Sequence, residues 1–385
     1  MSVWDELIGQ DEAVALFQRA VEASTRRTDD RSGMTSSWLI TGPAGSGRSN
    51  CAYAFAAALL CPNGGCGSCD SCEQVRARTH PDLTAIATET LLLDIKTARS
   101  LVDRASMQPM HARYRVIVVE DADRMIARTS NTLLKAIEEP PATTVWVLCA
   151  PSEADLLPTI RSRVRTVSLK VPSVADVAAL LAARDGIPAE LAERAARLAQ
   201  SHIGMARRLA TAPEVAQRRE QALDGVLQLS TTGAAVRKAA EWVELAQADG
   251  EAQSADRDAR ERDELLHSMG VPKGQAVPRQ MRSLVRDLEE HQKRRAKRAH
   301  LDGVDRILTD LQSLLRDLLT VQLDMGAPLV NAEREDELNS VARGRNPAST
   351  LTSIDAIATA RARLAANVPP ALALEALALD LMPRP

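Results

Sequence analysis

Four of the six cysteines lie in one short stretch, with three glycines between them. Glycine allows the backbone conformations of a tight loop, and four thiolates are the donor set of a closed, tetrahedral Zn²⁺ site with a structural role. An iron–sulfur cluster can use a similar set, and metal-free thiols are a third interpretation. The pattern favours structural zinc, and the expected ligands are Cys61, Cys66, Cys69 and Cys72. Cys51 and Cys149 are expected to pack in the core.

A second motif precedes the cysteines and matches the phosphate-binding pattern G-x-x-x-x-G-K-[ST] at every defined position except the lysine. Its residues are Gly42, Pro43, Ala44, Gly45, Ser46, Gly47, Arg48 and Ser49. In such a loop, backbone N–H groups and the following helix N-terminus bind phosphate oxygens, and the Ser49 hydroxyl reaches Mg²⁺. The motif lies between an expected strand and an expected helix, which favours binding of ATP or ADP with Mg²⁺ over a purely structural turn.

Two departures weigh against hydrolysis at this loop. Arg48 stands at the lysine position, and a planar guanidinium is not equivalent to a compact ammonium beside phosphates. At the end of a second apolar strand, a nucleotide hydrolase needs an Asp for Mg²⁺ and then a Glu for the attacking water. Here the order is reversed, with Glu120 first and Asp121 second. Because the two side chains differ in length, the exchange displaces both carboxylates, and displacements of about 1 Å already impair catalysis. The other interpretation is that both acids cap the helix that follows.

The elements that must position these residues alternate between strand and helix. Short apolar runs predict strands at 37–41, 115–120, 144–148 and 165–169. Helix formers predict helices at 50–60 and 130–138. Because parallel strands buried on both faces have continuous apolar runs, the pattern predicts an α/β layer with a parallel sheet.

Beyond Pro172 the chain becomes rich in Ala and Leu at helical spacing. We expect a nucleotide-binding domain at 1–171, a small helical domain at 172–212 and a larger helical domain at 213–385. Within the last, residues 251–298 are dense in charge. This favours a solvated long helix or an insertion without fixed structure. The other interpretation is a patch, centred on the basic run 293–298, that contacts DNA or a partner.

Composition excludes several classes of protein. The formal charge of −3 over 385 residues is not that of a surface built to neutralise phosphate backbones. Only Trp242 among the aromatic residues follows Trp146, so the C-terminal part lacks the platforms of a base-stacking protein. The apolar runs are shorter than the ~20 residues that span a bilayer, and the N-terminus has no signal-peptide pattern. We therefore expect a cytoplasmic protein that does not enter membranes.

Further segments are specific enough to compare with known families. They are WDELIGQ at 4–10, THPD at 79–82, NTLLKAIEEPP at 131–141 and LPTIRSR at 157–163. Together with the cysteine insertion after the loop helix, they resemble the AAA+ clamp-loader family of bacterial DNA polymerase III, and within it the delta-prime subunits. The resemblance is strong over 1–170, moderate over 171–212 and faint beyond, where 316–317, 329–331 and 374–377 carry it.

The resemblance implies an AAA+ domain with a zinc module, a helical lid, and a helical collar that joins subunits. With tau/gamma and delta subunits, such a chain forms an open hetero-oligomeric ring that uses ATP to place the sliding clamp on primed DNA. This subunit would contact the clamp mainly indirectly and meet DNA through the assembled complex. Arg163 would then be the arginine finger for a neighbour's ATP site, worth roughly 10³–10⁵ in rate. The other interpretation is a solvated surface arginine.

The sequence departs from the family pattern where hydrolysis is concerned. Val164 replaces the usual cysteine after Ser-Arg, and Cys149-Ala150-Pro151 replaces the polar first sensor. Arg207 falls at the second sensor, with Arg208 as an alternative, and either could be an exposed helix residue. The resemblance thus implies a delta-prime stator with little or no ATP hydrolysis of its own. The alternatives are a tau/gamma-like motor ATPase of the same complex and a zinc-bearing nucleotide scaffold unrelated to replication.

Overall fold

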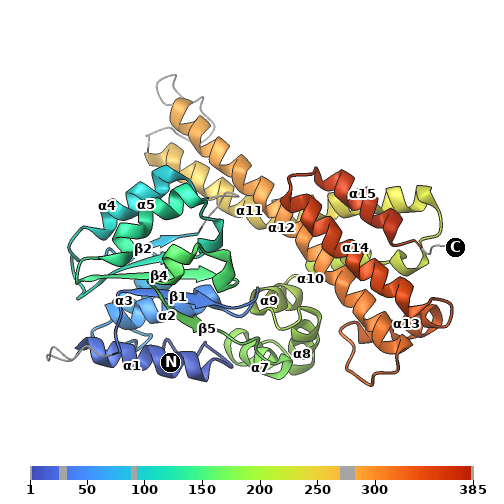
Figure 1. Cartoon of the computed structure of the whole chain (residues 1–385), viewed down its shortest axis with the longest axis horizontal. Helices are drawn as coiled ribbons and strands as arrows, with labels where there is room; N and C mark the ends of the chain where they lie inside the picture. The colour runs from blue at the N-terminus through green and yellow to red at the C-terminus, as the bar shows by residue number, and fades with distance from the viewer. Residues whose placement is uncertain (1, 26–32, 88–92, 269–281, 383–385) are drawn as a thin grey trace. The chain divides into compact units, whose positions relative to one another are not determined.

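The computed structural model describes residues 2–25, 33–87, 93–268 and 282–382. The chain divides into two compact units, residues 1–210 and residues 211–385 (Figure 1). No helix among the described residues is long and apolar enough to cross a membrane. The expected boundary at 171/172, between a nucleotide-binding domain and a lid, falls inside the first unit and stays a prediction.

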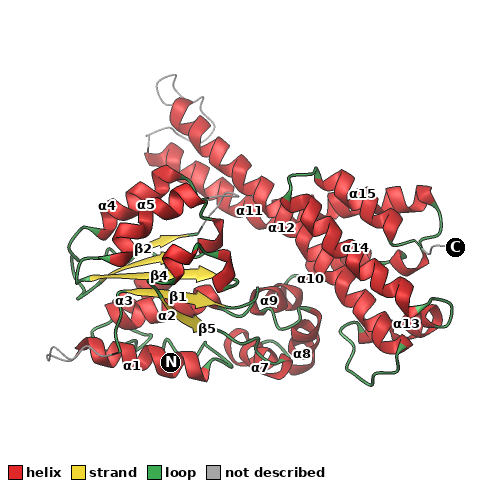
Figure 2. Ribbon diagram, viewed as in Figure 1, coloured by secondary structure: helices red, strands yellow, loops and turns green. Residues whose placement is uncertain are grey.

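The first unit is built on a five-stranded parallel sheet with the strand order β2-β3-β4-β1-β5 (Figure 2). The strands are β1 (Ser37–Thr41), β2 (Leu83–Ile86), β3 (Arg115–Val119), β4 (Thr144–Ala150) and β5 (Arg165–Ser168). Every residue of β1, β3 and β4 is buried, as expected for central strands covered on both faces. The predicted α/β class is confirmed, and the four predicted strands are present.

Alternate residues of the central strands enter cores on opposite faces of the sheet. In β1, Trp38 and Ile40 lie in one core, and Leu39 between them lies in the other. The first core is completed by α1 (Asp11–Thr25), α2 (Arg48–Leu60) and α3 (Asp70–Arg76). The second is completed by α4 (Ile95–Ala105), α5 (Ala127–Glu138) and α6 (Pro158–Arg161). Helices therefore cover both faces, which is what a parallel sheet requires.

Several elements of this unit are missing from the sequence prediction, among them strand β2 and helix α4. Strand β2 has four residues at the edge of the sheet, two of them only partly buried, so it lacks a long apolar run. Helix α4 begins after Asp94, whose side chain accepts a hydrogen bond from the backbone N–H of Thr97 (2.7 Å). This N-cap was the local signal that could have revealed the helix.

Asp82, the last residue of the THPD segment, anchors the loop between α4 and β3. It is fully buried, and its carboxylate accepts hydrogen bonds from the backbone N–H groups of Met110, His111 and Ala112. The Arg115 guanidinium lies 3.5 Å away. Burial by itself raises the pKa of Asp82, but these donors outweigh it and hold the pKa below its ordinary value. The segment thus has a structural role in the fold.

Three short helices complete the first unit: α7 (Val174–Asp185), α8 (Ala189–Leu198) and α9 (Ile203–Thr211). Ser173 caps α7, and its hydroxyl accepts the backbone N–H of Asp176 while the Asp176 carboxylate accepts the backbone N–H of Ser173. No strand follows β5 in the described residues, which agrees with the predicted change to helical spacing after Pro172.

The second unit is helical throughout its described part. Its helices are α10 (Pro213–Leu223), α11 (Thr232–Ser268), α12 (Arg282–Gln322), α13 (Glu335–Ala342), α14 (Pro347–Ala365) and α15 (Pro370–Asp380). Trp242 lies in an otherwise aliphatic core and donates its indole N–H to the carbonyl of Ala222 (2.8 Å). Helices α11 and α12 approach closely at Gly303, where a Cβ would lie 2.8 Å from the carbonyl oxygen of Ala246.

The charged segment 251–298 is helical where it is described, on α11 and α12. Arg295 of α12 lies 2.5 Å from both Asp258 and Glu261 of α11, and these ion pairs tie the two helices together. Lys293 and Lys297 are exposed. The described parts agree with the solvated-helix interpretation, while residues 269–281 lie outside the described residues. The DNA- or partner-contacting patch stays a prediction.

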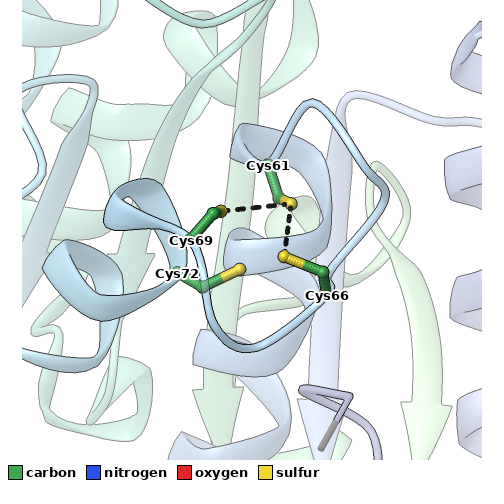
Figure 3. A group of neighbouring side chains, drawn as sticks. All are labelled: Cys61, Cys66, Cys69 and Cys72. Carbon is green, nitrogen blue, oxygen red and sulfur yellow. Dashed lines mark hydrogen bonds between the residues drawn. The ribbon is translucent and has the colours of Figure 1, made fainter.

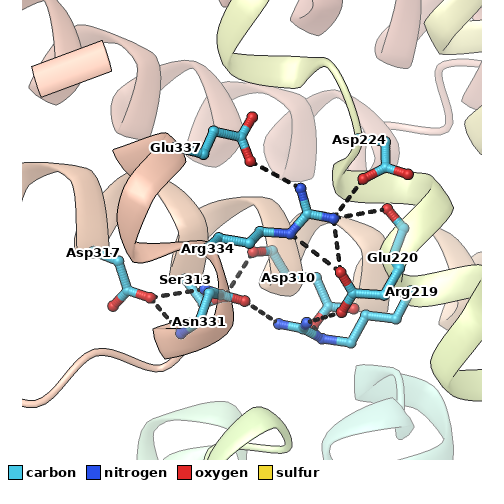
Figure 4. A network of polar contacts seen from close by, with 9 residues as sticks. All are labelled: Arg219, Glu220, Asp224, Asp310, Ser313, Asp317, Asn331, Arg334 and Glu337. Atoms are coloured by element: carbon cyan, nitrogen blue, oxygen red, sulfur yellow. Dashed lines mark hydrogen bonds and ion pairs between the residues drawn. The ribbon is translucent and has the colours of Figure 1, made fainter. Parts of the chain in front are cut away.

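A polar network joins α10 to the second half of α12 and to the segment after it (Figure 4). Buried Arg219 donates to Asp310 (2.9 Å) and to Asn331 (2.6 Å). Asp317, which is fully buried, accepts the backbone N–H groups of Val330 and Asn331. A buried charge without a partner would strongly destabilise the fold, and these buried charges are paired or hydrogen-bonded. The segments 316–317 and 329–331, distant in sequence, meet in this network.

Candidate nucleotide loop and metal centre

The predicted phosphate loop connects the carboxyl end of β1 to α2 (Figure 1). Gly45 and Gly47 have φ values of +84° and +86°, in the left-handed region that glycine favours. A Cβ on Gly45 would lie 2.6 Å from His202, so only glycine fits there. The Ser46 hydroxyl is buried without a hydrogen-bond partner. The backbone path and this unsatisfied hydroxyl fit an anion at the start of α2.

The two side chains that the motif offers to a nucleotide have partners within the protein. The Arg48 guanidinium donates to the carbonyl oxygen of Gly42, within the loop itself. The Ser49 hydroxyl donates to Oε2 of Glu120 (2.7 Å). In a phosphate loop, these positions serve the β- and γ-phosphates and Mg²⁺, respectively. The backbone of the loop therefore fits a nucleotide, whereas its side chains are engaged elsewhere.

Glu120, the first residue after β3, is the centre of these contacts. Its Oε1 accepts a hydrogen bond from the Tyr53 hydroxyl (2.7 Å) and lies 3.2 Å from the Arg78 guanidinium. Burial and the Glu120 charge raise the pKa of Tyr53, so the phenol stays protonated as a donor. Asp121 lies 3.8 Å from Arg124 of the following turn. The acidic pair thus follows β3, and Glu120 contacts the loop at Ser49.

The two sensor positions differ in how they meet the loop. At the first, the carbonyl of Pro151 accepts the backbone N–H of Gly42 (3.2 Å), and Cys149 is fully buried. At the second, the Arg207 side chain is 59% exposed and its Nε lies 3.2 Å from Asp185. The residue that reaches the loop from this region is His202. A sensor role for Arg207 stays a prediction.

Arg163 lies just after α6 and forms a bidentate ion pair. Its Nε is 2.9 Å from one carboxylate oxygen of Glu138, and its Nη2 donates to the other at 3.0 Å. Nη1 donates to the carbonyl of Thr159 and to the hydroxyl of Ser162. The hydrogen bond to Glu138 raises the pKa of Arg163, so the guanidinium keeps its charge. One third of the side chain is exposed, which leaves it accessible at the surface.

The four clustered cysteines converge at the other end of α2 (Figure 3). Their Sγ atoms all lie within 4.8 Å of one another, and Sγ of Cys61 is 3.7 Å from that of Cys66 and 3.6 Å from that of Cys69. Sγ of Cys72 accepts the backbone N–H of Gly67 (3.3 Å). Four sulfurs at this spacing, with amide donors turned toward them, could hold a tetrahedral Zn²⁺ ion.

The thiols of this cluster differ in acidity. A backbone hydrogen bond from Ser68 is the main cause that lowers the pKa of Cys66 to about 6, whereas burial raises the pKa of Cys72 to about 12. A coordinated metal ion deprotonates a thiol outright. Cys51 and Cys149 are buried and lie outside this cluster, as predicted.

Three residues of the nucleotide-loop region are missing from the sequence prediction: Tyr53, Arg78 and His202. Tyr53 follows Ser49 by one helical turn, so the spacing could have placed both on one face of α2. Arg78 follows α3 and His202 precedes α9. Neither belongs to a recognisable local pattern, because Arg78 meets Glu120 and His202 meets Gly45 only across the fold.

The first unit has a parallel sheet with the phosphate-loop motif after β1, and the described part of the second unit is helical. Residues 10–173 match the family model described as DNA polymerase III, delta subunit. The matched segment contains both the phosphate loop and the cysteine cluster.

Individual relatives are also similar in sequence to this chain. The chain is 34% identical over 199 residues to the DNA polymerase III subunit delta' of Pseudomonas aeruginosa, covering 50% of this chain and 60% of the relative. It is 34% identical over 140 residues to the subunit delta' of Escherichia coli, covering 35% and 42%. It is 29% identical over 182 residues to the subunit gamma/tau of Mycobacterium tuberculosis, covering 46% and 30%. The chain thus spans less than two thirds of each of these relatives.

Proposed function

We propose that this chain is a delta-prime subunit of the DNA polymerase III clamp loader. The family match over 10–173 and the identity to two delta' subunits support this proposal. In this role the chain joins tau/gamma and delta subunits in a cytoplasmic, hetero-oligomeric ring. It contacts the sliding clamp mainly indirectly and meets primed DNA through the assembled complex. The cysteine cluster serves as a structural zinc site that stabilises the first unit.

One observation favours a stator over a motor. The side chains of the nucleotide loop and of Glu120 contact other groups of the same chain. Arg48, Ser49 and Glu120 all have internal partners. A tau/gamma-like motor must turn the corresponding groups toward phosphate, Mg²⁺ and water during each turnover. The similarity to gamma/tau subunits keeps the motor as the competing function, but the contacts of these three residues favour a subunit with little or no hydrolysis.

The geometry of Arg163 supports its role as an arginine finger for a neighbour. The bidentate pair with Glu138 holds the guanidinium in one orientation at the surface of the first unit. A finger must present a permanent positive charge to a γ-phosphate bound by another subunit. An oriented and accessible guanidinium meets that requirement, because less side-chain entropy is lost when it docks.

The test is ATP turnover by the reconstituted clamp loader, with clamp and primed DNA present. Arg163→Ala should reduce hydrolysis by roughly 10³-fold or more at the single site that the finger serves, so total turnover should fall by at least the share of that site. Arg161→Ala is the matched control, since Arg161 ends the same helix and is similarly exposed. Unchanged turnover in Arg163→Ala would remove the finger assignment.

The motor alternative is tested on the chain alone. Purified chain with steady ATP turnover that disappears in Arg48→Ala would show that the loop hydrolyses ATP, and it would overturn the stator proposal. No turnover above background in either protein is the expected result. This measurement is independent of complex assembly, so it separates a failed reconstitution from a wrong assignment.

A further inference from the structure

We infer that Arg78 is an internal cation that neutralises Glu120 and occupies the magnesium side of the nucleotide loop. On this inference, helix α3, which begins within the cysteine cluster, positions Arg78. Arg78 in turn sets the nucleotide affinity of the loop. The inference concerns the loop's own binding properties, so it does not depend on the proposed role of Arg163.

The first observation is the backbone of Arg78. Its φ is +60°, in a region that L-residues other than glycine seldom adopt. The backbone N–H of Arg78 bonds to Val75 (3.0 Å) and that of Thr79 to Gln74 (2.8 Å). This is the Schellman pattern, and Arg78 stands at the C′ position where glycine is normally found. Backbone strain of this kind persists only where the surroundings hold the residue in place.

The second observation is what the Arg78 side chain contacts. Its guanidinium carbon lies 4.6 Å from the centre of the Tyr53 ring, and Nη1 lies 3.2 Å from Oε1 of Glu120. The Tyr53 hydroxyl donates to the same oxygen. Three segments, α2, the end of α3 and the end of β3, therefore meet at one carboxylate. The stacked ring orients the guanidinium, and the ion pair fixes its end.

The third observation is that Ser49 contacts the other oxygen of the same carboxylate. In phosphate-loop proteins, the hydroxyl at this position and an acidic residue after a neighbouring strand hold Mg²⁺. Here Glu120 already has a permanent cation beside it. A Mg²⁺ ion bound between Ser49 and Glu120 would meet the positive charge of Arg78 at short range. We therefore expect Arg78 to weaken binding of magnesium-bound nucleotide at this loop.

The fourth observation connects this contact with the cysteine cluster. Arg78 follows α3, which contains Cys72. Tyr53, Cys72 and Arg78 line one surface cavity between α2 and α3. The cysteines fix the start of α3, and the Schellman turn fixes its end. The position of the guanidinium thus depends on the same short helix that carries a metal ligand.

The experiment measures binding of a fluorescent ADP analogue to the full-length chain, once with Mg²⁺ and once with EDTA. Arg78→Gln should bind the magnesium-bound analogue on the order of tenfold more tightly than the wild type, since repulsion from a half-exposed charge is removed. The gain should disappear in EDTA. Arg78→Lys, which keeps the charge, should stay close to the wild type.

Two further variants make the result decisive. Arg76→Ala removes a nearby exposed arginine that contacts Gly67 rather than Glu120, and its affinity should match the wild type. Arg78→Gly removes the charge and also suits the left-handed backbone, so it should fold at least as well and bind like Arg78→Gln. Wild-type affinity in both charge-removing variants would overturn the inference. So would an equal gain with Mg²⁺ and with EDTA, which indicates a loosened loop rather than a lost cation.

Discussion

The two glycine-rich loops at the ends of α2 both carry a ligand-binding motif in the sequence, one for phosphate and one for a metal ion. They differ in where their side chains point. After α2, four cysteine sulfurs converge on one point and have mainly each other and backbone N–H groups as neighbours. At the start of α2, Arg48 and Ser49 contact Gly42 and Glu120 instead of a common centre. The difference teaches that a motif predicts a backbone path more reliably than it predicts what its side chains bind.

The largest effect is expected when one sulfur is removed from the cysteine cluster, which tests whether the four sulfurs share one metal ion. The four clustered cysteines predict one zinc ion per chain. Cys66→Ser should lower the metal content of the purified chain to well below half of that value, because a structural site with three thiolates is incomplete. Thermal unfolding should begin at a lower temperature, since metal binding is coupled to folding. Metal analysis and a thermal scan measure both effects.

Cys51→Ser is the control for that substitution, because Cys51 is buried in the core and lies outside the cluster. It should keep its zinc even if its stability falls. A brown preparation that contains iron would contradict the zinc assignment. Full zinc content in Cys66→Ser would contradict the ligand set.

The next largest effect is expected at Asp82, which links the segment after the cysteine loop to the sheet. Asp82→Asn should lower the free energy of unfolding by about 3 kcal/mol, since an amide turns a donor toward buried N–H groups and leaves the buried Arg115 charge without its carboxylate. Asp103→Asn, on the exposed face of α4, should change it little. Urea unfolding measures both. A loss of less than 1 kcal/mol would show that Asp82 does not anchor this loop.

The contribution of Asp82 also has a predictable dependence on pH. Its pKa is lower in the folded chain than in the unfolded chain. The stabilisation is therefore fully present above the unfolded value of about 3.9 and is lost as the pH falls through the folded value. The difference between wild type and Asp82→Asn should be constant near neutral pH and shrink below about pH 4.

A smaller effect tests how tightly the phosphate loop is held by its surroundings. Gly45→Ala should lower the free energy of unfolding by about 2 kcal/mol, from backbone strain plus the contact with His202. Gly186→Ala is the matched control, because its φ is +67° but nothing lies near its Cβ. It should cost about 1 kcal/mol from strain alone. Urea unfolding measures both variants. An equal loss of unfolding free energy in the two would show that His202 moves aside without cost and does not restrain the loop.

The sequence predicted the fold best where burial leaves a simple pattern. The central strands β1, β3 and β4 have continuous apolar runs because both faces of the sheet are covered. Strand β2 was missed because a four-residue edge strand with two partly buried residues lacks that pattern. Helix α4 was missed although its cap at Asp94 was available. Local signals were thus sufficient for the centre of the sheet and insufficient for its edge.

The sequence by itself determined the two loops, the parallel sheet and the resemblance to clamp-loader subunits, because each depends on residues close together in the chain. The cysteine cluster is the clearest case, since its spacing already defines the site. Tertiary structure alone decided that Ser49 contacts Glu120, 71 residues away. It also decided that Arg78 forms an ion pair with the same carboxylate. Such contacts depend on how strands and helices pack, and no local spacing in the sequence encodes that packing.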